Sequence, residues 1–173
     1  YRLSHTLSHA IHAFCQAHRV APFAVFYMAL AIYLNRACKS NTLCIGVPVY
    51  NRSNFTDKQT TGMFVSTLPF LSSFDETWTY EQFNEQLALQ WLDLLRYQKL
   101  PFSEIAALNK KLHPQSAELF HVVLSFQTSK IFESEDASVT FSGRWNYSGY
   151  QAQQLLIHLS SMEDAFHYSV DYD

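Results

Sequence analysis

The stretch Thr61-Gly62-Met63-Phe64-Val65-Ser66-Thr67-Leu68-Pro69 decides how this chain is expected to fold. Residues 63–71 are apolar and β-prone, so we predict a strand there, with the Met-Phe-Val triplet at its start in the core. Pro69 has no N–H to donate, which limits the strand to a sheet edge or places the proline at a strand end. Upstream, Leu43 to Val49 predicts a buried strand, and the polar segment Asn51 to Thr61 connects the two strands as a loop.

Helical periodicity flanks these strands. A first helix runs from a cap at Ser4 or Thr6 to about His18, because these side chains accept backbone N–H bonds. A second predicted helix is opened by Pro22 and closed by Asn35, Arg36 and Lys39. Two more span residues 80–97, capped by Thr79, and 101–108, opened by Pro101. The helix from Pro22 has no charged residue through Leu34, so we expect it to be buried on all sides.

The last third of the chain changes to strand-like patterns. We predict strands at Phe120–Phe126, Val139–Tyr147, Gln154–Ser160 and Phe166–Tyr172, with an acidic turn at Glu133–Asp136. The order is two helices, two strands, two helices and about four strands, which is not a strict βαβ alternation. The pattern predicts an α/β fold of the α+β type. We expect a mixed sheet with helices packed on it, forming one domain or subdomain over residues 1–173.

Composition argues against several classes of function. The formal net charge is −3, so nothing favours binding to nucleic acid or to an anionic membrane. The share of charged residues is 16%, which indicates a large core or a surface normally covered by a partner. Cys15, Cys38 and Cys44 form no C-x-x-C pair and predict free, buried thiols in a reducing cytoplasm. The N-terminal residues show no signal-peptide character.

Three histidines line one face of the first predicted helix. His5, His9 and His12 recur at i, i+4 and i+7, a spacing that three ligands of an open zinc site can take. No carboxylate on that face offers the hydrogen bonds that orient ligating imidazoles, and the stripe lies opposite the apolar one. We therefore expect a solvated polar face and no metal site.

The string His167-Tyr168-Ser169-Val170-Asp171 fits the pattern H-x-x-x-D. Acyltransferases related to chloramphenicol acetyltransferase use a histidine base and an aspartate at this spacing, within a loop. Here the surrounding residues predict a strand, on which His167, Ser169 and Asp171 project from one face without converging. Phe166 and Tyr172 also replace the tandem histidine and the trailing glycine of that motif. We expect neither His167 nor Asp171 to be catalytic.

Several stretches share their order and spacing with one known family. They are Ala21-Pro22-Phe23 with residues 29–36 (ALAIYLNR), residues 45–52 (IGVPVYNR), residues 61–69 quoted above, and Tyr97-Gln98-x-x-Pro101-Phe102. Residues 119–127 (LFHVVLSFQ) are similar to a core strand of the same family. Together these stretches resemble the condensation domains of nonribosomal peptide synthetases, with Tyr97 in place of a usual histidine.

The resemblance implies a fold of two chloramphenicol-acetyltransferase-like subdomains around a tunnel. This chain matches only the C-terminal subdomain, while the upstream subdomain supplies the catalytic histidine motif. In the family, two carrier proteins bring phosphopantetheine-tethered thioesters to opposite mouths of the tunnel, and the acceptor amine attacks the donor thioester. This chain would contribute tunnel wall and acceptor-side surface, would bind no cofactor directly, and would be inactive alone.

Residues of the matching stretches are candidates for the tunnel wall or the subdomain interface: Asn51, Arg52, Gly62, Met63, Ser125 and Gln127. Arg52 can pair bidentately with a carboxylate, although an ordinary loop role for Asn51 and Arg52 is equally open. Gly62 allows close backbone approach. Ser125 and Gln127 share one strand face and can reach the tunnel or satisfy a strand edge. We expect structural roles for the remaining motif residues, Tyr97, Gln98, Pro101 and Phe102.

Other functions of the same scaffold stay open. An epimerisation, heterocyclisation or free-standing acyltransferase relative would differ chiefly in the upstream subdomain, and a noncatalytic module would only dock a carrier protein. The expected partners are the N-terminal subdomain and peptidyl or aminoacyl carrier proteins. An apolar face that the other subdomain normally covers would also let the isolated chain form a homodimer.

Overall fold

The computed structural model describes residues 1–73, 75–115, 118–128, 149–150, 153–162 and 165–172. The helices are α1 (His5–His18), α2 (Pro22–Cys38), α3 (Phe55–Gln59), α4 (Tyr80–Arg96) and α5 (Phe102–Leu112). The strands are β1 (Thr42–Val49), β2 (Ser66–Ser73), β3 (Val122–Gln127), β4 (Leu155–Met162) and β5 (Ala165–Tyr172). The predicted strand Val139–Tyr147 and the acidic turn Glu133–Asp136 lie outside the described residues.

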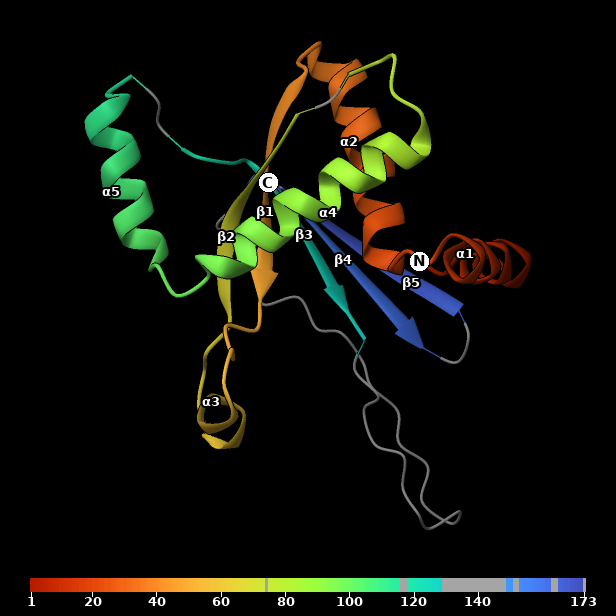
Figure 1. The fold of residues 1–173 in the computed structure, drawn as a ribbon, viewed down its shortest axis with the longest axis horizontal. Coiled ribbons are helices and arrows are strands. Elements are labelled where there is room, and N and C mark those ends of the chain that lie inside the picture. Colours follow the sequence, from red (N-terminus) through yellow and green to blue (C-terminus); the bar gives the residue numbers. More distant parts are fainter. Residues whose placement is uncertain (74, 116–117, 129–148, 151–152, 163–164, 173) are drawn as a thin grey trace.

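The described strands form one mixed sheet in the order β2-β1-β3-β4-β5. β1 is parallel to β3, and β3 is parallel to β4, whereas β2 and β5 pair antiparallel with their neighbours. Helices α2 and α4 lie across one face of this sheet, α1 packs beside β5, and α5 stands to one side of β2 (Figure 1). The predicted fold class, a mixed sheet with helices packed on it, is confirmed.

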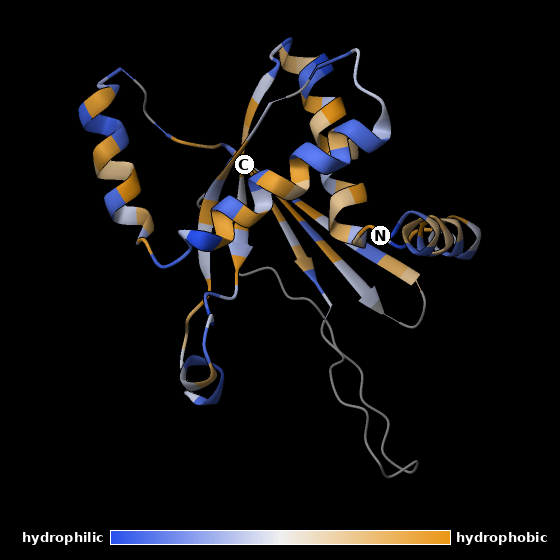
Figure 2. Ribbon diagram, viewed as in Figure 1, coloured by the Kyte–Doolittle hydropathy of each residue, from blue (hydrophilic) through white to orange (hydrophobic). Residues whose placement is uncertain are grey.

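The core lies between the sheet and helices α2 and α4. On β1, the alternate residues Ile45 and Val47 are fully buried and belong to one core cluster with Tyr27 of α2 and Phe70 of β2. Tyr27 Oη lies 2.8 Å from Ser72 Oγ, so the phenol at the centre of the core has a hydrogen-bond partner. Helix α4 alternates hydrophobic and hydrophilic bands along its length (Figure 2), and it buries Phe83 and Leu87 on its packed side.

Local capping chemistry explains where the helices begin. The Ser4 side chain accepts the Leu7 N–H at the start of α1, as predicted. Thr79 and Gln82 form a reciprocal capping box at the start of α4, and Pro22 occupies the first turn of α2. The side-chain bonds of Ser4, Thr79 and Gln82 satisfy N–H groups at the helix starts that have no partner within the helix.

Three expectations from the sequence are wrong. Helix α2 is not buried on all sides, because only one side packs on the sheet and Tyr33 is exposed on the other. Strand β2 begins at Ser66, so Met63 belongs to the preceding loop and is exposed instead of lying in the core. Cys38 is exposed, although all three cysteines are free as predicted.

Strand β2 forms one edge of the described sheet. Pro69 therefore occupies the edge position that its missing N–H requires, as predicted. At the other edge, Leu3 N donates to Phe166 O at 2.9 Å, which ties the N-terminal residues to β5.

Among the described residues, no single helix is long and apolar enough to cross a membrane. Helices α1 and α2 reach that length and composition only together, and a bend of 107° separates them.

Candidate functional site

A cleft opens where β1 and β3 end. The two strands are parallel, so their carboxyl ends meet at the same side of the sheet. Polar and apolar residues from β1, β3 and the β1–β2 loop line a volume of about 270 Å³: Pro48, Val49, Tyr50, Val65, Ser125, Phe126 and Gln127. Two of the predicted candidates, Ser125 and Gln127, thus lie together in one cleft. Ser125 is buried and Gln127 is half-buried, so the polar groups sit in a largely apolar surrounding.

The β1–β2 loop, residues 50–65, is organised around Arg52. Its guanidinium donates to the carbonyl oxygens of Asp57, Thr60 (2.7 Å) and Gly62 (2.8 Å). The same group lies 4.2 Å from the ring centroid of Phe64, a cation–π contact. Arg52 therefore binds backbone carbonyls of its own loop, and the planar guanidinium suits this because its donors fan out in fixed directions.

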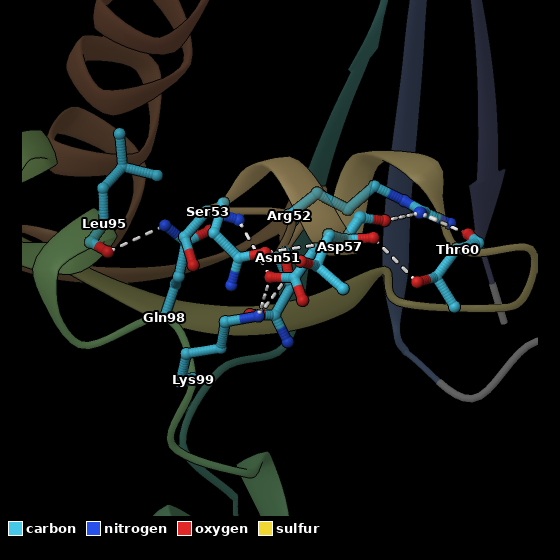
Figure 3. A network of polar contacts seen from close by, with 10 residues as sticks. Asn51, Arg52, Ser53, Asp57, Thr60, Leu95, Gln98 and Lys99 are labelled. Atoms are coloured by element: carbon cyan, nitrogen blue, oxygen red, sulfur yellow. Dashed lines mark hydrogen bonds and ion pairs between the residues drawn. The ribbon is translucent and has the colours of Figure 1, made fainter.

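Lys99, between α4 and α5, ties the same loop to the helical layer (Figure 3). Its Nζ donates to Asn51 O at 2.8 Å and lies 2.6 Å from Asp57 Oδ2. The hydrogen bond from Lys99 is the largest influence on Asp57 and lowers the pKa of its carboxyl. Asp57 also accepts the Ser53 N–H, so the same carboxylate binds both the backbone of its own loop and Lys99.

Backbone conformation accounts for two more candidates. Asn51 has φ of 54° and Gly62 has φ of 145°, both in the region that L side chains rarely adopt. A Cβ on Gly62 would meet only Phe64, at 3.8 Å, so conformation and not crowding requires glycine there. These two residues set the shape of the loop that carries Met63.

The predicted structural motif lies where α4 passes into α5. Tyr97 ends α4, and Gln98 Nε2 donates to Leu95 O at 2.9 Å, which satisfies a carbonyl at the helix end. Pro101 precedes the first turn of α5, and Phe102 lies against Phe120 with ring centroids 5.5 Å apart. These contacts are of the packing and capping kind.

His167 and Asp171 lie on β5, an ordinary strand, as predicted. Asp171 Oδ2 is 3.8 Å from Nε2 of His158 on the neighbouring strand β4. Burial lowers the pKa of His158, and the nearby Asp171 carboxylate opposes this effect in part. The aspartate of the H-x-x-x-D string therefore pairs with a histidine outside that string.

His158 is a residue that sequence reasoning missed. In the strand register His158 is paired with Ser125 on β3 and with Ser169 on β5, so all three project from the same face. The polar row extends from the cleft across β4 to the edge strand. Period-two alternation indicates which face a residue takes, but the neighbour of each strand is not visible in local sequence.

The histidines that line one face of α1 do not share one environment. His5 Nε2 lies 2.7 Å from the Arg2 guanidinium, whereas the His12 ring stacks on Phe166 with centroids 4.6 Å apart. The expected solvated face is wrong for His12, because the buried side of α1 is turned toward β5 through Ser8. Across the described part of the chain, no group of three His, Cys, Asp or Glu side chains is placed to hold a metal ion.

Comparison with known proteins decides the family. The sequence matches the family described as "Condensation domain" over residues 1–172. This chain belongs to the condensation domain family. It is 29% identical to Surfactin synthase subunit 1 of Bacillus subtilis (strain 168) over 99% of the chain, and 26% identical to Tyrocidine synthase 3 of Brevibacillus parabrevis over 71% of the chain. The matched regions span 5% and 2% of the lengths of those relatives.

Solved structures agree on the fold. Holo-AB3403, a four-domain nonribosomal peptide synthetase bound to AMP and glycine, superposes over the whole chain with a TM-score of 0.80 at 15% identity, and the chain covers 14% of it. The first condensation domain of the calcium-dependent antibiotic synthetase, in complex with a substrate analogue, gives 0.75 at 16% identity and 38% coverage. The family and fold expected from the sequence motifs are confirmed.

The side chains that line the cleft limit the chemistry it can support. Ser125 offers a hydroxyl and Gln127 an amide, groups that donate and accept hydrogen bonds with a polar chain lying in an apolar channel. Neither side chain is a strong nucleophile or base without an activating partner. The cleft is therefore suited to binding and orienting a substrate, and less suited to proton transfer.

Proposed function

We propose that this chain is the C-terminal subdomain of a condensation domain that forms amide bonds in a cytoplasmic nonribosomal peptide synthetase. The observation that carries the proposal is the family match over residues 1–172. The chain covers 38% to 40% of solved structures described as single condensation domains, which supports a fold with a second subdomain beyond this one.

The substrates are thioesters held on the phosphopantetheine arms of carrier proteins, and this chain holds no cofactor of its own. The acceptor amine nitrogen attacks the thioester carbonyl, and a C–N bond forms. The C–S bond then breaks, the amine gives up one proton, and the donor arm leaves as a free thiol. The tetrahedral oxyanion between these steps needs hydrogen-bond donors aimed at it.

This chain contributes surface to that reaction and not the base. The cleft at the ends of β1 and β3 forms part of the tunnel wall, with Ser125 and Gln127 orienting the acceptor arm. Asn51, Arg52 and Gly62 shape the loop at the rim of the tunnel. The catalytic histidine belongs to the other subdomain, since Asp171 pairs with His158 and His167 lies on a regular strand.

A single-turnover assay on the full-length protein that contains this chain tests the proposal. Donor and acceptor carrier domains are loaded with aminoacyl thioesters, and the acceptor arm is analysed by mass spectrometry. Amide-linked product on the acceptor arm is expected. A donor returned with inverted stereochemistry would favour an epimerisation relative, a ring-closed product would favour heterocyclisation, and a carrier complex without any product would favour a docking module.

Two single substitutions test whether the cleft binds the acceptor substrate. Ser125→Ala and Gln127→Ala are expected to raise the KM for the acceptor carrier more than they lower kcat, because they remove binding groups and not the base. Cys38→Ala, an exposed position at the end of α2, is the matched control and is expected to leave both constants unchanged. Unchanged constants in both cleft variants would remove the cleft from the proposal.

A further inference from the structure

The lining of the cleft at the ends of β1 and β3 ranges from buried to exposed. Val49 is 4% exposed and Ser125 6%, whereas Tyr50 is 69% exposed and Val65 47%. The cleft therefore has a buried floor that carries one hydroxyl, and an open mouth of aromatic and aliphatic side chains. Its volume of about 270 Å³ corresponds to roughly nine water-sized groups, which fits one amino-acid side chain better than a longer segment.

Phe126 gives this cleft a fixed wall. Its ring centroid lies 6.5 Å from that of Phe23 and 6.1 Å from that of Phe26, both on α2. On the other side, the ring of Phe166 on β5 lies 6.4 Å away. Because these contacts hold Phe126 without any substrate, the cleft is preformed, as small-molecule sites usually are.

Among the residues that the structure describes, no charged side chain lines the cleft. The charged groups of the adjoining loop are engaged elsewhere: Arg52 donates to backbone carbonyls, and Asp57 lies 2.6 Å from Lys99. A charged side chain that entered the cleft would lose its water and meet no opposite charge in this wall, which is costly. An apolar side chain would gain contacts with Phe126 and Val65 and leave no charge uncompensated.

We propose that the cleft selects the acceptor amino acid by its side chain, and that it takes an uncharged aliphatic or aromatic one. This inference rests on the proposed function, because it assigns the cleft to the acceptor. Ser125 and Gln127 hydrogen-bond polar atoms of the acceptor arm, while Val65 and Phe126 contact the side chain. Gln127 determines the charge preference, because it is half-buried at the end of β3 and its amide is neutral.

A series of acceptors tests the preference in single turnovers of the full-length protein. The donor carrier keeps one aminoacyl group, and the acceptor carrier is loaded chemically with a leucyl, phenylalanyl, aspartyl or arginyl thioester. We expect the rate constant of amide formation to be about thirtyfold or more lower for aspartyl and arginyl acceptors, because each buries a charge that this wall does not compensate.

Substitutions at Gln127 should redirect the charge preference. Gln127→Glu places a carboxylate in the wall and is expected to raise the rate for the arginyl acceptor about tenfold, without a gain for aspartyl. Gln127→Lys is expected to favour aspartyl in the same way. Gln86→Glu, at an exposed position on α4, makes the same change outside the cleft and should alter none of the four rates. A distorted strand would lower all four rates together and would not produce this crossed pattern.

The outcomes separate this inference from the proposed function. Equal wild-type rates for all four acceptors, in a protein that forms amide product, overturn the selection alone. Absence of amide product with every acceptor overturns the proposed function. If both Gln127 variants lose all activity, Val65→Phe decides instead, because the added ring fills the mouth of the cleft. Its rate for phenylalanyl is expected to fall about tenfold or more below that for leucyl, and an unchanged ratio overturns the selection.

Exchange of the donor identifies which substrate occupies the cleft. The same four aminoacyl groups are placed on the donor carrier, and the acceptor is kept as leucyl. We expect Gln127→Glu to leave the ranking of the donors unchanged. A donor ranking that shifts with Gln127→Glu, while the acceptor ranking stays fixed, would assign the cleft to the donor and overturn the proposal.

Discussion

Replacement of Arg52 by alanine tests the organisation of the β1–β2 loop. The substitution removes the donors to the carbonyl oxygens of Asp57, Thr60 and Gly62, and it removes the cation over Phe64. Among the described residues, no other side chain donates to the carbonyl of Thr60 or Gly62. The loop is therefore expected to open locally while the sheet keeps its structure.

The magnitude follows from the contacts. We take about 0.5–1 kcal/mol for each of three partly exposed hydrogen bonds and a similar amount for the cation–π contact. The sum is about 2–3 kcal/mol in the local opening free energy, after allowance for contacts that water replaces. This corresponds to a rise of roughly 30- to 160-fold in the opening equilibrium constant. Global stability is expected to change by less than about 1 kcal/mol, because the core lies on the helix side of the sheet.

Hydrogen–deuterium exchange with mass spectrometry measures this opening. A peptide covering residues 53–62 reports the loop, and a peptide within β1 reports the sheet. Arg52→Lys keeps the charge but not the fan of donors, so its exchange should fall between that of wild type and Arg52→Ala. Arg96→Ala is the control, because Arg96 is an exposed helix residue whose ion pair with Asp93 is 3.6 Å long.

Unchanged exchange in the loop peptide of Arg52→Ala would refute this reasoning. Equal exchange in Arg52→Lys and wild type would show that charge alone suffices, and would contradict the role given to guanidinium geometry. A parallel rise in the β1 peptide would mean that the loop and the sheet unfold together.

Three other predictions concern single residues. The Lys99 hydrogen bond lowers the pKa of Asp57. The loop should therefore stay anchored until the pH falls through that lowered pKa, below the ordinary value of about 3.9. Lys99→Met should raise the pKa of Asp57 in a carbon NMR titration, and an unchanged pKa would contradict the pairing. Gly46→Ala places a methyl 2.5 Å from the Phe120 ring and 2.8 Å from Val123. It should cost about 1–3 kcal/mol in urea unfolding, and Val123→Ala should recover part of this; full stability in Gly46→Ala would be inconsistent with the packing. Burial lowers the pKa of His158, so the unfolded chain takes up a proton first and the fold loses stability as the pH falls below about 6.5. His158→Gln should flatten this dependence between pH 7 and 5, while His9→Gln, exposed on α1, should keep it; a His158→Gln curve parallel to wild type would argue against the effect.

Helix starts and the sheet edge could be predicted because their causes are local. A cap needs an acceptor and an N–H three residues away, so Thr79 with Gln82 is visible in the sequence. Pro69 has no N–H to donate to a neighbouring strand, so the sequence alone restricts it to a sheet edge or a strand end. The structure places it on an edge strand. Family membership followed from motif order and spacing, which do not require a knowledge of packing.

The β1–β2 loop was predicted less well because its order comes from distant contacts. Lys99 lies 42 residues beyond its partner Asp57, and no local pattern connects them. One local signal was available: Asn54 followed by Asp57 is an N-cap arrangement, and it begins the short helix α3. The apolar run from Met63 to Leu71 predicts one continuous strand with Met63 in the core, whereas the loop continues to Val65 and β2 begins at Ser66.

The pairing of Asp171 shows the limit of motif reasoning. The strand prediction was sufficient to exclude convergence of His167 with Asp171, since residues on a strand face step along it. The partner, His158, depends on the register between β4 and β5. Registers are set by turns and packing that a single strand does not contain.

The central claim is that the histidine used in catalysis lies outside this chain, and His167→Ala in the full-length protein tests it most directly. Amide formation between carrier-bound substrates is measured in single turnovers, with His121→Ala, an exposed position before β3, as the control. We predict a rate within a few-fold of wild type for both variants. A loss of more than about a hundredfold in His167→Ala alone, the scale of one acid–base group, would contradict the claim.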